Sequence, residues 1–170
     1  MMIATEYKSI SRDAIPAALD KAERYRLLNE PAQAESICHD ILAVDPDNQQ
    51  ALIALLLSLT DQFPADPAEC FAQAKAIVPK LRGEYERHYY RGLIYERRGH
   101  AAALQNHPGS ATAAYEWLRE AMDLFEQAEA VRPQGNDDAI LRWNSCLRLI
   151  ERYHLHPETV PAGDPVLGDD

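Results

Sequence analysis

Six histidines and three cysteines are the side chains of this sequence best suited to binding a metal. Imidazole and thiolate are ligands that transition metals prefer. His154 and His156 are two residues apart and, together with His100 or His107, could supply such a ligand set. All four fall at the end of an expected helix or in loop-like sequence, where histidines are commonly solvated. We therefore predict no metal site and keep metal binding as an alternative.

The cysteines give no sign of redox or metal chemistry. Cys38, Cys70 and Cys146 are odd in number, and no two form a Cys-x-x-Cys pair. Each lies beside apolar residues, so we expect small buried side chains in a reducing compartment. The sequence also lacks a Gly-x-Gly-x-x-Gly run, a phosphate loop, a nucleophile elbow and a His-Glu-x-x-His zinc motif. We predict no catalytic residues and no cofactor, and hence a protein that is not an enzyme.

Composition places the chain among globular, helix-rich proteins. Its 170 residues are 46% hydrophobic and 26% charged with only 7 glycines, which is enough for one domain with its own core. The formal net charge of −10 disfavours nucleic acid as a partner, because such binding needs a basic surface. The longest apolar run, residues 51–57, is far shorter than the roughly 20 residues of a membrane span. Residues 1–12 contain no apolar signal region, so we expect a soluble cytoplasmic protein without membrane insertion.

Prolines and capping residues divide the chain into helices. The expected helices cover residues 13–28, 31–44, 48–62, 66–79, 81–98, 111–131 and 136–153. Asp66 followed by Pro67 is a strong helix start, and Pro133 follows a helix end. Gly99 is expected to end the fifth helix as a left-handed residue, and Ser110 to cap the sixth. The chain is therefore predicted to be all-α, with about seven helices in antiparallel hairpins.

Small and aromatic residues recur at related positions of these helices. The matching sets are Ala22, Tyr25, Ala34 and Pro46; then Leu52, Leu55, Leu59, Phe71, Ala74 and Pro79; then Arg91, Gly92, Tyr95, Ala121, Phe125, Ala128 and Pro133. Small residues let two helices approach closely while aromatic residues fill the remaining volume. This pattern resembles the tetratricopeptide repeat family, whose period is about 34 residues.

The resemblance implies an α-solenoid with a defined layout. An N-terminal extension, residues 1–12, precedes a repeat domain over residues 13–153. Its units cover about 15–48, 49–80 and 85–135, and a capping helix covers 136–153. Because Gly99 and Ala121 are much farther apart than the family pattern requires, we interpret residues of about 101–117 as an insert that lengthens the sixth helix. Residues 154–170 are expected to be an acidic flexible tail, which could fold back onto the basic stretch 75–98.

In this family the first helices of successive units line a concave groove that receives a peptide or a helix. Carried over, the groove would present Leu19, Ile53, Leu57, Tyr89, Leu93, Glu96, Arg97, Ile140, Asn144 and Arg148, with insert contacts at Tyr115 and Trp117. Members that clamp a carboxylate have Lys and Asn where this chain has Leu19 and Glu23, so a receptor for chaperone tails is disfavoured. We predict a non-catalytic protein-protein interaction module or adaptor that binds a peptide or amphipathic helix.

Three alternatives stay open at this point. The apolar groove residues could belong to the core and be covered by the insert or the tail. A helical enzyme or metal-binding domain could use groove residues such as Tyr89, Glu96 and Arg97. The partner could also be a second copy of the chain, bound through the groove or through the insert.

Overall fold

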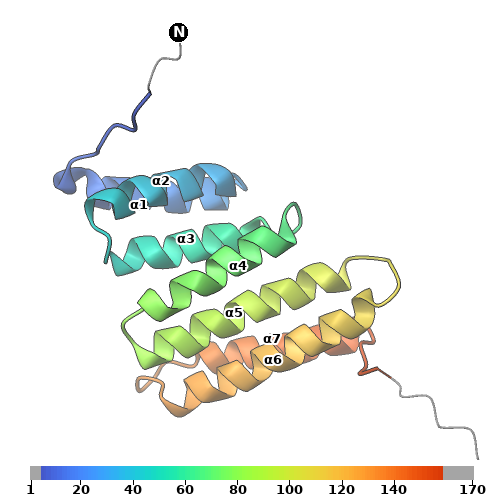
Figure 1. The fold of residues 1–170 in the computed structure, drawn as a ribbon. Coiled ribbons are helices and arrows are strands. Elements are labelled where there is room, and N and C mark those ends of the chain that lie inside the picture. The colour runs from blue at the N-terminus through green and yellow to red at the C-terminus, as the bar shows by residue number, and fades with distance from the viewer. Residues whose placement is uncertain (1–4, 159–170) are drawn as a thin grey trace, which may run out of the picture.

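Seven α-helices run back and forth through residues 5–158, the part of the chain that the computed structural model describes (Figure 1). They are α1 (Ile15–Leu27), α2 (Pro31–Val44), α3 (Gln49–Asp61), α4 (Pro67–Ile77), α5 (Glu84–Ala103), α6 (Ser110–Ala130) and α7 (Asp138–Arg152). Two short 3-10 turns, Arg12–Ala14 and Val78–Lys80, precede α1 and follow α4. Within this range there is no strand. The prediction of an all-α fold with about seven helices is confirmed.

Side chains that satisfy free backbone N–H groups fix several helix starts. The carboxylate of Asp66 accepts a hydrogen bond from the N–H of Glu69 (3.4 Å), as the sequence pattern predicts for α4. Asn48 does the same for the N–H of Ala51 (2.9 Å) at the start of α3. Pro31 is the first residue of α2, where its missing N–H costs no hydrogen bond.

The predicted end of the fifth helix is wrong. α5 continues through Gly99 to Ala103, and Gly99 is buried inside it. A Cβ at Gly99 would lie 2.8 Å from Cγ of Leu118, so this glycine permits close contact between α5 and α6. The left-handed glycine lies later, at Gly109 (φ 83°), just before α6. Glycine is favoured both where two helices pack closely and where a helix ends. At Gly99 the close packing against α6 explains the glycine.

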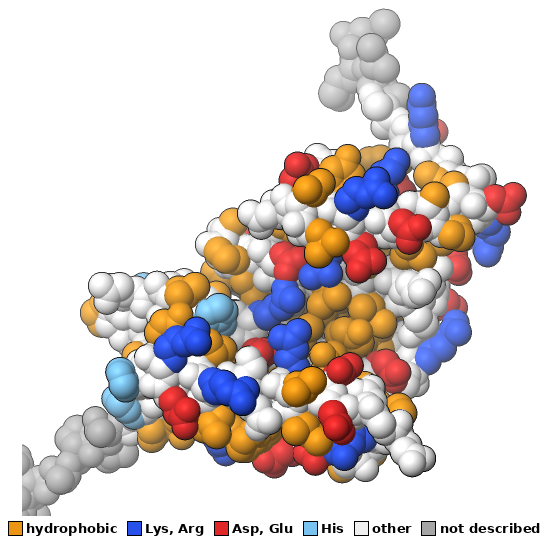
Figure 2. Space-filling model, turned by 180° about the vertical axis from the view of Figure 1, so that it is seen from behind, with side chains coloured by type: hydrophobic (Ala, Val, Ile, Leu, Met, Phe, Trp, Pro, Cys, Tyr) orange, Lys and Arg blue, Asp and Glu red, His pale blue; other side chains and the backbone are white. Residues whose placement is uncertain are grey.

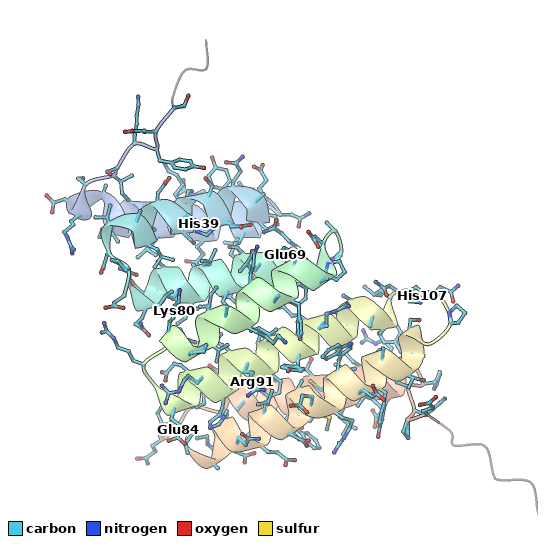
Figure 3. The ribbon with its side chains drawn as sticks, in the orientation of Figure 1. His39, Glu69, Lys80, Glu84, Arg91 and His107 are labelled. Carbon is cyan, nitrogen blue, oxygen red and sulfur yellow. The ribbon has the colours of Figure 1, made fainter. Side chains whose placement is uncertain are left out.

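Ser110 does not cap α6 in the predicted way. It is the first residue of that helix, and its hydroxyl donates to the backbone carbonyls of Gln105 (2.9 Å) and His107 (2.8 Å). The serine therefore ties down the loop before α6 rather than accepting from the helix N–H groups. His107 lies at the tip of this loop (Figure 3).

Each helix packs against its neighbours in the order of the chain. α1 pairs with α2, α3 with α4, and α5 with α6, while α2, α4 and α6 each contact the next helix along. α1, α3, α5 and α7 also contact one another in that order, behind α2, α4 and α6 in the view of Figure 1. One side of the molecule is thus built entirely from alternate helices.

The small residues named from the sequence lie where helices approach. Ala22, Ala34, Ala121 and Ala128 are fully buried. A Cβ at Gly92 would lie 2.8 Å from Cε1 of Phe125, which is fully buried on α6. A side chain larger than hydrogen is therefore excluded at Gly92 unless the ring moves.

The residues predicted to be an insert belong to both helices of the α5–α6 hairpin, not to the sixth helix alone. Residues 101–117 form the last turn of α5, the loop to Gly109 and the first turns of α6. Trp117 on α6 packs against Phe71 of α4 and Tyr95 of α5, with ring centroids 5.1 and 5.5 Å away. Trp117 thus gives α6 a direct contact with α4.

The chain remains ordered beyond the predicted end of the repeat domain. Leu155 is 6% exposed and belongs to the core around α5, α6 and α7. The expected tail therefore does not begin at residue 154. Residues 159–170 lie outside the described residues. The prediction that the tail folds onto the basic stretch 75–98 falls on them.

Candidate binding groove

Two hollows lie along the face built by α1, α3, α5 and α7 (Figure 2). The α1–α3 hollow, about 460 Å³, is lined by Pro16, Leu19, Asp20, Glu23, Arg26, Gln50, Ile53, Ala54 and Leu57. The α3–α7 hollow, about 470 Å³, is lined by Thr60, Asp61, Phe63, Pro64, Glu96, Arg97, His100, Ala101, Leu104, Arg142, Ser145 and Leu149. Hydrophobic and charged side chains of both signs meet in the hollowed region of Figure 2. We call the two hollows together the groove.

The α1–α3 hollow has an apolar floor and an acidic rim. Leu19, Ile53 and Leu57 are half-buried and provide the floor, as the sequence predicts. The lining residues follow one another every three or four positions along α1 and along α3, so each helix contributes one stripe of side chains to the hollow. Asp20 and Glu23 are exposed on α1 beside this floor. This hollow offers apolar surface together with solvated carboxylates.

An ionic bridge separates the two hollows. Nε of Arg26 on α1 donates to Oδ2 of Asp61 at the end of α3 (2.8 Å), and Nη1 of Arg97 on α5 donates to Oδ1 of the same carboxylate. All three side chains are less than one-third exposed. One carboxylate therefore links three alternate helices, α1, α3 and α5, and neither arginine carries a free charge. The sequence analysis did not identify Asp61. The available signal was an acidic residue at the end of an otherwise apolar helix, which needs a cationic partner when it is partly buried.

A second ion pair joins α5 to α7. Glu96 is 5% exposed, and its Oε2 lies 3.5 Å from Nη1 of Arg142. Ser145 lies close to Glu96, and Tyr89 close to Arg142. Burial raises the pKa of Glu96, and the nearby guanidiniums of Arg142 and Arg97 offset this only in part. The contact holds α7 against α5 at the cost of burying a carboxylate.

Some predicted groove residues lie elsewhere. Leu93 is 2% exposed and belongs to the core, so its assignment to the groove surface is wrong. Tyr89 contacts a smaller hollow with Leu141 and Arg142, but its ring is also stacked on Tyr85, with centroids 5.6 Å apart. Tyr89 therefore has a structural role as well as a surface position.

The face of α7 was assigned wrongly. The predicted residues were Ile140, Asn144 and Arg148, whereas Arg142, Ser145 and Leu149 line the α3–α7 hollow. The reason is that α7 buries Ala139 and Cys146, seven residues apart, and this contact sets the rotation of the helix about its axis. Trp143 reinforces that rotation, since its Nε1 donates to Oε1 of Glu126 on α6 (3.0 Å).

The two predicted insert contacts are engaged within the chain. Tyr115 and Trp117 are both partly buried and pack against the core shared by α5, α6 and α7. The guanidinium carbon of Arg98 lies 5.8 Å from the centroid of Trp117. Trp117 also lines a shallow hollow of about 370 Å³ on this side of the molecule, together with Tyr95, Glu116 and Glu120.

The described residues contain little that could perform chemistry. Cys38, Cys70 and Cys146 are free and buried, and burial raises the pKa of Cys38 to about 11 and those of Cys70 and Cys146 as well. Such thiols are poor nucleophiles because little thiolate forms near neutral pH. Within residues 5–158, no three His, Cys, Asp or Glu side chains lie close enough together to hold a metal ion.

Comparison with known proteins adds no identification. No protein-family model, curated protein or solved structure matches the chain. The tetratricopeptide assignment therefore stays a prediction from sequence. In the part of the chain that the structure describes, no helix has both the length and the apolar character needed to cross a bilayer.

Proposed function

We propose that this chain is a non-catalytic, tetratricopeptide-like adaptor that binds a peptide or an amphipathic helix of another protein in its groove. The observation that supports the proposal most is the apolar floor of the α1–α3 hollow. Leu19, Ile53 and Leu57 keep part of their surface exposed although they lie side by side on neighbouring helices. Three neighbouring large aliphatic side chains left partly in solvent are a cost to a lone protein and a contact surface for a partner.

The length of this floor suits a helix. From Pro16 to Arg26 the lining residues on α1 span ten positions, which is about 15 Å at 1.5 Å per residue. A partner helix would cover that distance in about three turns, with apolar residues at positions i, i+3 or i+4, and i+7. The residues that line the hollow on α1 and α3, polar ones included, follow the same spacing.

Burial of the floor would not be enough for tight binding. Burying a whole Leu or Ile side chain contributes about 1.5–3 kcal/mol, so covering the minor part that remains exposed on these three side chains contributes at most about 3 kcal/mol. A micromolar complex requires roughly 8 kcal/mol after the costs of association. A partner must therefore also bury apolar side chains of its own and engage the polar groups of the groove.

The proposed location is the cytoplasm. Three free cysteines are buried, with none paired within residues 5–158. Unpaired thiols suit a reducing compartment.

Affinity capture with Leu57→Glu tests the function. The substitution places a charge in the apolar floor, so proteins held in the groove should be lost, while a circular-dichroism spectrum reports whether the helices remain. Val131→Glu is the matched control, because Val131 is 41% exposed at the end of α6 and lines neither hollow. We expect at least one protein to be captured by wild type and Val131→Glu but not by folded Leu57→Glu. If both variants capture the same proteins as wild type, the groove is not the interface.

A further inference from the structure

The free charges on the rim of the α1–α3 hollow are all negative. Asp20 and Glu23 are exposed, and neither forms an ion pair with any described residue. The lining also contains one cation, Arg26, but its guanidinium is held by Asp61. A partner in this hollow therefore meets two carboxylates without counterions of their own and an arginine that is already neutralised.

The rest of the groove does not reverse this sign. In the α3–α7 hollow, Arg97 is paired with Asp61, and Arg142 with Glu96. Outside the groove, the smaller hollow next to Tyr89 is lined by Asp138. This exposed carboxylate also forms no ion pair within residues 5–158. His100 also lines the α3–α7 hollow.

From this charge pattern we propose that the α1–α3 hollow selects basic amphipathic segments, with Lys or Arg beside the apolar side chains that cover Leu19, Ile53 and Leu57. This inference rests on the proposed function and specifies the partner's chemistry. Lys and Arg suit the place because their long aliphatic stems can lie along apolar surface while the charged ends reach a carboxylate. An acidic segment would be repelled by Asp20 and Glu23.

The charge of the whole chain acts in the same direction. A net charge of −10 attracts cationic segments and speeds their encounter at low salt. That attraction is not specific, so the test must separate the rim carboxylates from the overall charge. Glu116 and Glu120 on α6 provide this control, because they are also exposed, form no ion pair with a described residue, and line a different hollow next to Tyr95 and Trp117.

The experiment selects random 16-residue peptides displayed on phage against the full chain, after depletion on Leu57→Glu. The retained peptides should carry apolar residues at helical spacing and an excess of Lys and Arg. The best peptide is then synthesised, and its Kd is measured by fluorescence anisotropy with two double variants of equal net charge. We expect about three- to tenfold weaker binding to Asp20→Asn/Glu23→Gln, and less than a twofold change for Glu116→Gln/Glu120→Gln.

The outcomes separate the inference from the function on which it rests. Retained peptides that are neutral or acidic would overturn the basic preference while leaving a groove that binds peptides. Equal weakening by both double variants would also overturn it, because the attraction would then be due to net charge alone. If no peptide depends on Leu57, the proposed function fails together with the inference. Circular dichroism of each variant confirms that the helices are retained.

Discussion

The contact between Gly92 and Phe125 gives the sharpest test of the packing. Gly92→Ala adds one methyl group in the middle of α5. On the present backbone, the new Cβ would lie 2.8 Å from Cε1 and 2.9 Å from Cδ1 of the Phe125 ring. Carbon atoms pack best about 3.5–4.0 Å apart, so the ring or the helix would have to move by about 0.7 Å.

The surroundings of Phe125 limit that movement. The ring is fully buried, and the ring of Tyr89 lies 5.9 Å away between centroids. Overpacking of this kind typically costs about 1–3 kcal/mol. Alanine regains about 1 kcal/mol over glycine as a helix former, which partly offsets the strain. We therefore expect Gly92→Ala to lower the free energy of unfolding by up to about 2 kcal/mol, even though the same change on an exposed helix face would raise it.

Urea unfolding followed by circular dichroism measures this effect, and a double-mutant cycle isolates its cause. Phe125→Leu removes most of the atoms that the new methyl group meets, so Gly92→Ala should cost less in that background, with a coupling of about 0.5 kcal/mol or more. Ala72→Gly, on the exposed side of α4, calibrates the helix-propensity contribution. An identical cost of Gly92→Ala with phenylalanine or leucine at position 125 would refute the predicted steric contact.

Two further predictions concern the ion pairs of the groove. Asp61→Asn should lower the free energy of unfolding by about 1–2 kcal/mol in urea, between the values typical of exposed and of buried pairs, because Arg26 and Arg97 lose a shared carboxylate; an effect within error would mean that the bridge is only a surface contact. For Glu96 the raised pKa means that the protonated form stabilises the fold at acid pH, and that this contribution is lost as the pH rises through the folded-state pKa. The free energy of unfolding of wild type relative to Glu96→Gln should therefore fall as the pH rises above the ordinary pKa of a glutamate, and a constant or rising difference would contradict the assignment.

Local sequence signals predicted the helices well because their causes are local. Asp66 with Pro67 marks the start of α4, and the first four helices lie close to their predicted ranges. Gly99 shows where this reasoning fails. A glycine after two arginines has the local features of a helix end, but its reason for being there is Leu118 on another helix. The identity of that neighbour depends on tertiary contacts that no short window of sequence contains.

The residues predicted to line a groove do line a hollow on α1 and α3 but not on α7, and partner binding in that hollow stays a prediction. Ile53 and Leu57 line the hollow as expected. On α7 the predicted face was carried over from the family pattern, whereas the burial of Ala139 and Cys146 places Arg142, Ser145 and Leu149 along the hollow. The ion pair between Glu96 and Arg142 was missed for the same reason.

Some of the apolar residues predicted for the groove are buried in the core, and others keep surface that solvent can reach. Leu93 is covered by the chain itself, whereas Leu57 and Ile53 keep exposed surface in the α1–α3 hollow. The residues predicted to be an insert do not cover that surface, because Trp117 packs against Phe71 on α4, a helix that contributes no residue to either hollow. The first turns of α6 therefore pack behind the groove and leave the α1–α3 hollow accessible from solvent among the described residues, which is the condition that a partner helix requires.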